Sequence, residues 1–331
     1  MTNRERFNKT LNFEKTDRLP IIEWAYWWDK TIERWHGEGL PAEITEATKI
    51  RDYFGQDAHR QCWAQPRAAN CPYPAGHGQS LINSREDYLE LKKYLYPENA
   101  FDKDLVRSWV KGQADGDLVI WMTLEGPFWY PRTLFGIEPH MYAFYDLPEL
   151  MKEINQDLLE FCIRVYNDFC DICVPDFMTV AEDMSYNHGP MLSESQFEEF
   201  MAPYYRTFTP IMKERGTTVF VDTDGDITIP AKWFTSVGVQ GLLPLERMAG
   251  VDVSALRKAH PDLRMIGAYD KTVMHLGEAR MRQEFERLLP VMKQGGFIPS
   301  CDHQTPPGVS LEDYWLYMRL LREYCEMAMA D

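Results

Sequence analysis

The feature that most constrains the fold of this chain is a regular alternation of short apolar runs with longer amphipathic segments. The runs have the length and the aliphatic and aromatic content that favour β-strands, and the segments between them repeat apolar residues at helical spacing. Repeated strand–helix units of this kind are typical of parallel α/β folds. The eight expected strands cover residues 19–24, 58–63, 118–124, 177–181, 217–221, 239–243, 263–267 and 296–300.

Eight such units in 331 residues predict an α/β protein with a (β/α)8 TIM barrel, and we interpret residues 1–331 as a single domain. The main alternative is a doubly wound open sheet, which usually carries a glycine-rich phosphate loop after its first strand. No such loop is present, since Gly76-His77-Gly78 lacks the flanking strand and helix. An N-terminal extension precedes the first strand, and the long insertions at 25–57 and 64–117 are expected to form cap elements over one rim.

Charge and composition exclude several classes of protein. The net charge of −16 argues against a surface for nucleic acids or anionic membranes. No apolar stretch approaches the roughly 20 residues of a membrane span, and the N-terminus has no apolar signal core. The seven cysteines, an odd number, are interpreted as free thiols rather than as a disulfide framework. We therefore expect a soluble, cytoplasmic protein.

Ionisable and aromatic residues gather where the expected strands end, which is where barrel enzymes carry their chemistry. The last run ends in Cys301-Asp302-His303, which can supply metal ligands, a general acid/base pair, or both. The other strand ends contribute Glu23, Trp24, Tyr26, Trp27, Glu125, Glu182, His188, Asp222, Asp224, Glu246, Tyr269 and Asp270.

So many carboxylates at one rim would repel one another without compensation. A bound cation, shared protons, or the side chains of Lys271 and Arg247 would supply it. Alternatively, about half of the carboxylates cap the helices that follow, and Asp183 and Asp226 are the expected caps.

The spacing of Asp222 and Asp224 places both side chains on the same side of an extended segment. With Cys301 or His303 from a distant strand, they would form a three- or four-ligand zinc site. A set made only of carboxylates would instead suit magnesium or calcium.

Six tryptophans at or near strand ends are candidates for an aromatic chamber above the barrel, which would suit a ring-bearing ligand. We expect Trp121, inside the third strand, to pack in the core, and Trp27 and Trp28, beyond a strand end, to line the chamber. The six are Trp24, Trp27, Trp28, Trp63, Trp121 and Trp129.

A set of short motifs follows a fixed order along nearly the whole chain. They are NRERF at 3–7, LNFEKTDRLP at 11–20, EDM at 182–184, GPMLS at 189–193, PYY at 203–205, GAYDK at 267–271, DH at 302–303, PP at 306–307 and SLEDY at 310–314. In these motifs the chain resembles the uroporphyrinogen decarboxylase superfamily. The resemblance implies a (β/α)8 barrel, in agreement with the strand pattern, and favours a homodimer, although the oligomeric state stays open.

The superfamily contains two chemistries. True uroporphyrinogen decarboxylases use no metal and bind the carboxylates of a tetrapyrrole with N-terminal arginines. Here the matching region after Pro20 has no arginine and carries Glu23, which would repel a polycarboxylate. The aspartate-bearing segment expected after the second strand is also missing around Gln61-Cys62-Trp63. These departures disfavour porphyrinogen decarboxylation.

The other branch resembles corrinoid-linked methyltransferases, in which zinc activates a thiol or a similar acceptor. Its His-x-Cys pattern falls on Asp222 and Asp224, and its later cysteine falls on Cys301. The carboxylates would bind zinc less tightly than thiolate and imidazole. The change fits a different methyl donor or acceptor, such as a methoxy or methylamine compound. The corrinoid is expected on a separate carrier protein, because the chain lacks an Asp-x-His-x-x-Gly cobalamin motif.

We therefore predict a methyltransferase in which a metal, expected to be zinc, acts as a Lewis acid on a small substrate. The predicted metal ligands are Asp222, Asp224, Glu246 and Cys301, and the predicted catalytic acids and bases are His303, Glu182 and Asp270. The predicted substrate-binding residues are Glu23, Trp24, Tyr26, Trp27, Glu125, His188 and Tyr269.

Two alternatives remain at this point. One is a metal-independent decarboxylase of a smaller, less anionic acid, which would need basic residues such as Arg132, Arg247 or Lys271 at its pocket. The other is a non-catalytic binding barrel, in which the rim carboxylates would be caps and ion-pair partners.

Overall fold

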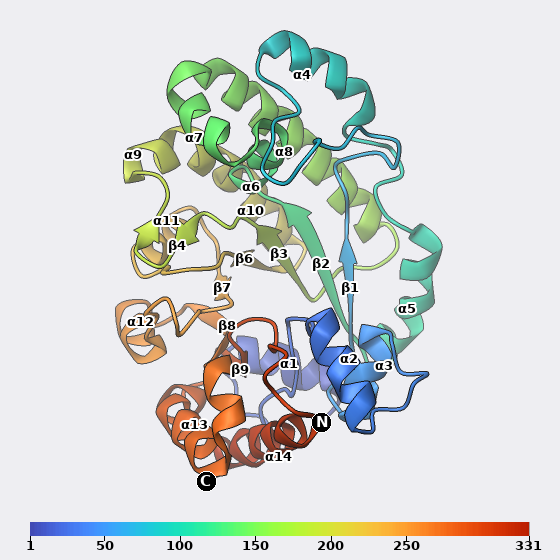
Figure 1. Cartoon of the computed structure of the whole chain (residues 1–331), viewed down its shortest axis with the longest axis vertical. Coiled ribbons are helices and arrows are strands. Elements are labelled where there is room, and N and C mark those ends of the chain that lie inside the picture. The colour runs from blue at the N-terminus through green and yellow to red at the C-terminus, as the bar shows by residue number, and fades with distance from the viewer. Residues whose placement is uncertain (331) are drawn as a thin grey trace.

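The computed structural model describes residues 1–330 as an α/β fold around a curled, seven-stranded parallel sheet (Figure 1). Neighbouring strands pair in the order β1 (His59–Trp63), β2 (Val119–Glu125), β3 (Phe177–Ala181), β6 (Thr218–Asp222), β7 (Gly241–Leu243), β8 (Arg264–Tyr269) and β9 (Phe297–Cys301). A separate hairpin pairs β4 (Ser185–Tyr186) with β5 (Gly189–Pro190). Seven of the eight expected strands are confirmed, each to within two residues. The arrangement is that of a TIM-like barrel.

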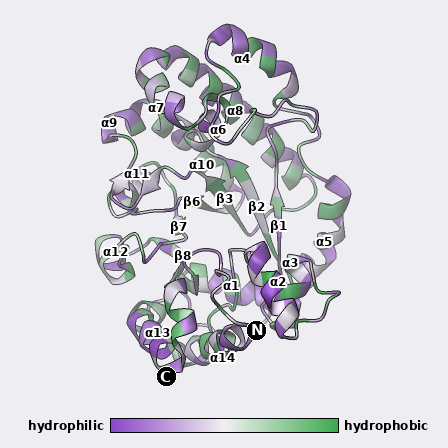
Figure 2. Ribbon diagram, viewed as in Figure 1, coloured by the Kyte–Doolittle hydropathy of each residue, from purple (hydrophilic) through white to green (hydrophobic). Residues whose placement is uncertain are grey.

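Helices occupy most of the chain between the strands and pack outside the sheet (Figure 1). Figure 2 shows the strands as mainly hydrophobic and the outer helices as two-sided. The helices are α1 (Asn3–Leu11), α2 (Asp29–Glu38), α3 (Ala47–Tyr53), α4 (Arg85–Leu91), α5 (Lys103–Asp115), α6 (Trp129–Phe135), α7 (Ile137–Asp146), α8 (Pro148–Cys170), α9 (Glu194–Gln196), α10 (Ala202–Glu214), α11 (Pro230–Ser236), α12 (Val253–Ala259), α13 (Glu278–Met292) and α14 (Leu311–Met327), with short turns η1 (Lys92–Tyr94), η2 (Phe197–Met201) and η3 (Lys271–Leu276). Within residues 1–330, none of these helices combines the length and the apolar content that crossing a membrane requires.

The barrel has an inner core and an outer core, and alternation along the strands decides which residue joins which. The inner core takes Trp121 of β2, Phe177 of β3 and Phe220 of β6, and Phe7 of α1 packs against it. The rings of Trp121 and Phe177 stack at 5.3 Å. The residues between them on each strand face the helices in the larger outer core. The remaining inner-core residues are Leu11, Ile22, Val119, Leu243, Ile266 and Ile298.

Residues 19–24, the expected first strand, form no strand, so this prediction is corrected. One backbone hydrogen bond remains, from the N–H of Asp57 to the C=O of Ile21 at 2.8 Å, and side chains take the place of other ladder hydrogen bonds. The backbone N–H of Ile21 donates to Asp57 Oδ2 at 3.0 Å, and the backbone N–H of Cys301 donates to Glu23 Oε2 at 3.0 Å. The segment thus contacts both the residues that lead into β1 and the end of β9. It fills the place of an eighth strand without pairing as one.

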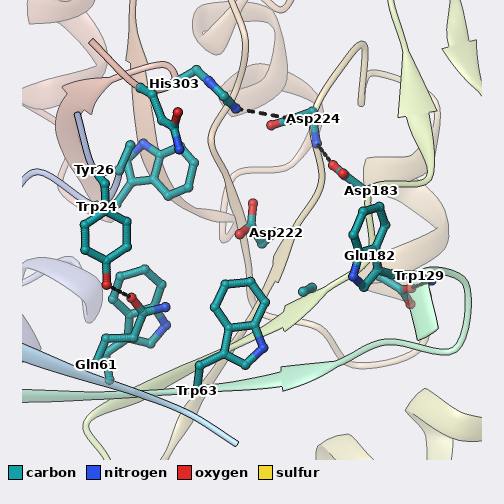
Figure 3. Close-up of a pocket in the computed structure, with 14 residues that line it drawn as sticks. Trp24, Tyr26, Gln61, Trp63, Trp129, Glu182, Asp183, Asp222, Asp224 and His303 are labelled. Atoms are coloured by element: carbon teal, nitrogen blue, oxygen red, sulfur yellow. Dashed lines mark hydrogen bonds and ion pairs between the residues drawn. The ribbon is translucent and has the colours of Figure 1, made fainter. Parts of the chain in front are cut away.

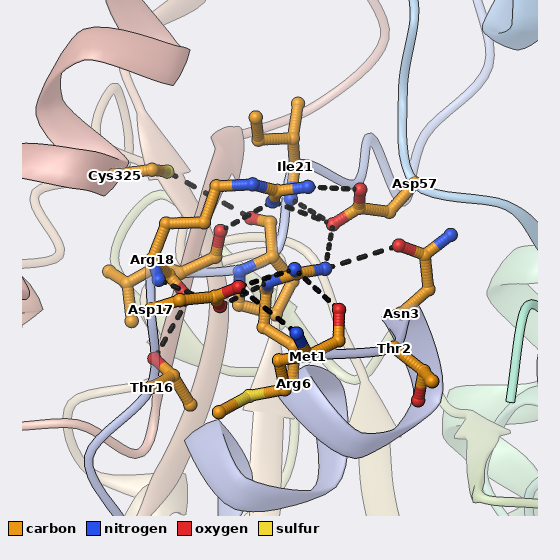
Figure 4. Close-up of polar contacts among 12 residues, drawn as sticks. Met1, Thr2, Asn3, Arg6, Thr16, Asp17, Arg18, Ile21, Asp57 and Cys325 are labelled. Carbon is orange, nitrogen blue, oxygen red and sulfur yellow. Dashed lines mark hydrogen bonds and ion pairs between the residues drawn. The ribbon is translucent and has the colours of Figure 1, made fainter.

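Four charged residues near the N-terminus form what we call the N-terminal ion cluster: Arg6, Asp17, Arg18 and Asp57 (Figure 4). Arg18 donates two hydrogen bonds to Asp57, at 2.8 and 2.6 Å, and Arg6 donates two to Asp17, both at 2.8 Å. The bonds from Arg6 hold the pKa of Asp17 below its usual range. Each carboxylate of this cluster therefore has a guanidinium partner.

Candidate active site

A cavity of about 190 Å³ lies where the strands of the sheet end (Figure 3). It is lined by five aromatic residues, four carboxylates and one histidine, and within residues 1–330 no lysine or arginine lines it. We call it the acidic pocket. Its aromatic residues are Trp24, Tyr26, Trp63, Trp121 and Trp129, its carboxylates are Glu182, Asp183, Asp222 and Asp224, and its histidine is His303.

Glu182 is held firmly in the wall of the acidic pocket and is fully buried. Its Oε2 atom accepts hydrogen bonds from the backbone N–H groups of Phe128 and Trp129, at 2.9 and 3.3 Å, and its Oε1 accepts one from the Tyr205 hydroxyl. Gly126 makes room for it, since a Cβ there would lie 2.3 Å from the Glu182 carboxyl carbon. Burial outweighs these donors and raises the pKa of Glu182 to about 8. This group can therefore exchange a proton near neutral pH.

Asp222 follows Phe220 by two residues and thus shares its inward direction. Its carboxylate reaches into the middle of the acidic pocket (Figure 3). Among residues 1–330 it has no hydrogen-bond donor and no ion-pair partner. Burial, together with the charges of Asp224 and Asp183, raises the pKa of Asp222 well above its ordinary value.

Asp183 faces the same cavity from the loop after β3. Its Oδ1 atom accepts a hydrogen bond from the backbone N–H of Asp224 at 3.4 Å, and burial raises its pKa. Its backbone φ of 47° lies in the left-handed region, which non-glycine residues rarely adopt. We expected Asp183 to cap a helix, whereas the structure assigns it to the pocket wall. Backbone strain of this kind clusters at functional sites.

A candidate metal site lies at one side of the pocket, where Asp224, Glu246 and His303 each place one ligand atom within 4.8 Å of the other two. His303 Nε2 lies 3.3 Å from Asp224 Oδ2, and this contact raises the pKa of His303. Glu246 accepts a hydrogen bond from the backbone N–H of Gly225 at 2.9 Å and lies 3.5 Å from Lys271 Nζ. Two carboxylates and an imidazole are an acceptable donor set for a divalent cation. Asp224 and Glu246 were predicted as ligands, and His303 was predicted as an acid/base and named as an alternative ligand.

Two of the predicted residues lie on the outer side of the barrel wall. Cys301 is three residues after the inward-facing Ile298, so alternation directs it to the outer core, where it is 1% exposed and burial raises its pKa. Glu23 adjoins the inward-facing Ile22 and is likewise buried outside the cavity. It accepts hydrogen bonds from Cys301 and from the Tyr317 hydroxyl, and burial raises its pKa to about 7. The structure does not bring either side chain to Asp222 or Asp224.

Three further predicted residues also lie outside the cavity lining. Tyr269 is fully buried and packs on Phe285 with ring centroids 4.5 Å apart. Asp270 caps η3 through a 2.8 Å hydrogen bond from the Thr272 backbone N–H. His188 is exposed in the turn between β4 and β5.

The tryptophans divide differently from our expectation. Trp121 was expected to be core only, but it also forms part of the cavity lining. Trp27 packs in the outer core against Trp35 and Tyr314, and Trp28 is exposed at the start of α2, so neither lines the cavity. Of the residues that follow Ile22, Trp24, Ala25 and Tyr26 line the cavity, Trp27 is in the outer core and Trp28 is exposed, a division that the sequence alone did not resolve.

Glu125 was predicted to bind substrate and lies next to the acidic pocket rather than in its lining. Trp63 Nε1 donates a 3.2 Å hydrogen bond to Glu125 Oε1, while the buried Oε2 has no partner within residues 1–330. Burial raises the pKa of Glu125 to about 7.

Sequence reasoning missed Gln61 as a site residue and expected Asp183 to cap a helix, yet both line the pocket, together with Trp63 and Trp129 from the expected aromatic chamber. Gln61 and Trp63 are two residues apart on β1, so their side chains point to the same side of the strand, which is the side of the cavity. The signal available in the sequence was their position at strand ends.

The family model described as Uroporphyrinogen decarboxylase (URO-D) matches residues 86–324. No curated protein matches the chain. Among solved structures, a methyltransferase from Methanosarcina mazei is similar with a TM-score of 0.66 at 15% identity, covering 98% of this chain and 99% of that one. A protein proposed to be a vitamin-B12-independent methionine synthase from Listeria monocytogenes has a TM-score of 0.48 at 11% identity, covering 96% and 99%. The first likeness shows the fold.

Proposed function

The chain belongs to the uroporphyrinogen decarboxylase family, and we propose that it is a methyl-transferring enzyme that binds a small substrate in the acidic pocket. One observation carries the proposal: four carboxylates line the pocket, and within residues 1–330 no lysine or arginine does. A polycarboxylate such as a tetrapyrrole would be repelled there. The cavity volume of about 190 Å³ is also below the roughly 300–1,000 Å³ typical of pockets for drug-sized ligands.

The charge that develops during reaction supports methyl transfer over decarboxylation. Loss of CO₂ leaves its electron pair on carbon, and neighbouring carboxylates destabilise that negative charge. A methyl group instead leaves its donor without the bonding pair, so positive charge is shared between the methyl carbon and the donor atom. Carboxylates such as Asp222 and the aromatic faces around it stabilise positive charge.

The residues at the candidate metal site fit a divalent cation, because three ligand atoms converge from Asp224, Glu246 and His303. A bound metal would supply a Lewis acid at the heteroatom of the substrate. We propose these three as the ligands, in place of a set that includes Cys301. Ligation requires an unprotonated His303 and displacement of Lys271 from Glu246.

We assign acid/base chemistry to Glu182 and His303, two of the three residues predicted for it from the sequence, and leave out Asp270, which caps η3. Glu182, with its pKa of about 8, is poised to accept or return a proton at the wall of the cavity. His303 is oriented by its contact with Asp224, which fixes one ring nitrogen. When no metal is bound, His303 is the second group able to protonate a leaving group.

We further propose that the methyl group passes to or from a corrinoid on a separate carrier protein. A corrinoid supplies a cobalt centre able to carry a methyl group. The cavity of about 190 Å³ is small, so we place the macrocycle at its mouth rather than inside it. Trp63 and Tyr26, each more than two-fifths exposed, offer aromatic surface there.

The decarboxylase alternative requires basic side chains in the pocket, and the three candidates are placed elsewhere. Arg132 lies over the Trp129 ring at 5.3 Å and donates to the Asp183 backbone carbonyl. Lys271 pairs with Glu246, and Arg247 donates to a backbone carbonyl of its own loop. None of the three lines the cavity.

The test is methylation of free cob(I)alamin by the purified full chain, followed by absorbance. Tetramethylammonium, choline, methanol and 2-methoxyphenol would each be offered as the methyl donor. We expect methylcobalamin from at least one donor, and a loss of about 100-fold or more in rate for Asp222→Asn. Asp226→Asn is the matched control, because Asp226 binds Thr228 and does not line the pocket. Absence of methyl transfer from all donors, with CO₂ released from uroporphyrinogen, would overturn the proposal.

A further inference from the structure

We propose that the acidic pocket selects a small organic cation whose nitrogen carries methyl groups. This inference rests on the proposed function for the fate of the ligand, but its binding claim stands on the pocket itself. Two independent features meet there: a central carboxylate without a partner, and walls of aromatic rings.

The first feature is unbalanced charge. Glu182 already has three hydrogen-bond donors, and Asp224 has His303. Asp222 has no partner among residues 1–330, although it projects into the middle of the cavity (Figure 3). A carboxylate that is largely removed from water and has no partner is destabilising in general. A ligand that supplies one positive charge would remove that penalty.

The second feature is the aromatic lining of the cavity. Trp24, Tyr26 and Trp63 line the cavity on one side of Asp222, and Trp129 lies across from them (Figure 3). Aromatic faces bind weakly hydrated organic cations and are poor ligands for hydrated metal ions. The metal-ligand set also excludes Asp222 and includes Glu246, which is not part of the lining. We therefore distinguish two adjacent sites, one for a metal ion and one for an organic cation.

The same lining favours a ligand whose nitrogen is methylated. A primary ammonium would bind through its three N–H donors to acceptors and would make little use of the aromatic rings, whereas a quaternary ammonium has no N–H donor and uses both the negative charge and the aromatic faces that line this cavity. The cavity of about 190 Å³ is also suited to a compact head group. Both arguments favour a ligand of the choline or tetramethylammonium type.

The chemistry of transfer is balanced for such a donor. The C–N bond breaks and its electron pair stays on nitrogen, while the methyl carbon forms a bond to the nucleophile of the acceptor. The donor leaves as a neutral amine, so no proton is needed for its departure. Because the amine has lost its charge, it also loses its attraction to Asp222, which favours product release.

The test is isothermal titration of the full chain in EDTA, which removes metal-mediated binding. Choline would be compared with 3,3-dimethylbutan-1-ol, its neutral isostere, and with ethanolamine, its unmethylated analogue. We expect choline to bind about tenfold or more tightly than either. Equal binding of the neutral isostere, equal binding of ethanolamine, or no binding of choline would overturn the inference.

Variants locate the binding. Asp222→Asn is expected to weaken choline binding by about tenfold or more, and Asp226→Asn to leave it unchanged. Thermal unfolding of both proteins verifies that they are folded, and unchanged affinity in a folded Asp222→Asn variant would contradict the inference. Choline binding without methyl transfer would uphold the inference and defeat the proposed function. Transfer only from neutral donors, without choline binding, would do the reverse.

Discussion

The N-terminal ion cluster and the acidic pocket are both rich in carboxylates, but they differ in how those charges are compensated. In the cluster, Asp57 receives two hydrogen bonds from Arg18 and one from the Ile21 backbone. In the pocket, Asp222 receives none from residues 1–330. The cluster joins the N-terminal segment to the start of β1, whereas the pocket faces a cavity.

The difference separates charges that stabilise the fold from charges held ready for a ligand. A buried ion pair with good geometry is self-sufficient, and removing one partner exposes the cost of burying the other. Carboxylates that repel one another are retained against stability, which is a common property of functional sites. Four predictions test this contrast, beginning with the largest effect.

The first compares charge removal in the two regions. Asp57→Ala should lower the free energy of unfolding by about 3–5 kcal/mol, because it leaves the Arg18 guanidinium without its carboxylate partner and leaves Arg6 with Asp17 alone. Asp222→Asn should leave it unchanged or raise it by about 0.5–2 kcal/mol, because it removes repulsion from Asp224 and Asp183. Urea unfolding measures both. A loss for Asp222→Asn as large as that for Asp57→Ala would erase the distinction.

The second concerns Glu182 and pH. Its folded pKa of about 8 lies above the ordinary value of 4.5, so the folded state binds the proton more tightly than the unfolded state. Its contribution to stability is therefore present at low pH and is lost as pH rises toward 8. Between about pH 5 and about pH 8, Glu182→Gln should reduce this loss by on the order of 3 kcal/mol, at about 1.4 kcal/mol per pKa unit.

Urea unfolding at several pH values measures this dependence. The exposed Glu33→Gln is the control and should follow the parent curve. Parallel curves for Glu182→Gln and the parent would show that Glu182 titrates alike in both states.

The third prediction distinguishes the metal-ligand set that we propose, which includes Glu246, from the set predicted from the sequence, which also includes Cys301. Glu246→Gln should weaken zinc or manganese binding by about tenfold or more, since it removes one of three converging ligands. Cys301→Ser should keep metal affinity, although a hydroxyl in the outer core is expected to lower stability by about 1–3 kcal/mol. Equilibrium dialysis with elemental analysis measures the metal. Loss of metal in Cys301→Ser alone would restore the set predicted from the sequence.

The smallest effect is expected at the rim. Trp63→Phe keeps a ring over the pocket but removes the hydrogen bond to Glu125. It should weaken choline binding by only about 0.5–1 kcal/mol, or roughly two- to fivefold. By isothermal titration, the loss of choline affinity should be much larger for Asp222→Asn than for Trp63→Phe. A reversed order would indicate that ring contact, rather than the unpaired charge, dominates recognition.

The sequence predicted the positions of the strands better than it predicted which side chains of each strand point into the barrel. Seven strands were placed to within two residues, because an apolar run marks a buried strand whichever way its side chains point. Residues 19–24 were apolar enough to resemble a strand, yet Asp57 and Glu23 accept the hydrogen bonds that a ladder would have received. Apolar content alone does not distinguish these two cases.

The same limit explains the ligand predictions. A one-residue difference in phase along a strand moves a side chain from the cavity to the outer core. Asp222 shares the phase of inward-facing Phe220, whereas Cys301 has the opposite phase to Ile298. The residue types at the rim were readable from the sequence, but their direction was not.

By itself the amino-acid sequence determined the α/β class, the order of the strands, the family motifs and the excess of carboxylates at strand ends, because these depend on local pattern and on residue type. Only the tertiary structure decided which carboxylates have partners. Asp57 meets Arg18 and Glu23 meets Tyr317 through contacts between distant segments, while Asp222 is left facing a cavity. Pairing is a property of three-dimensional neighbours, and it is pairing that distinguishes a structural charge from a binding one.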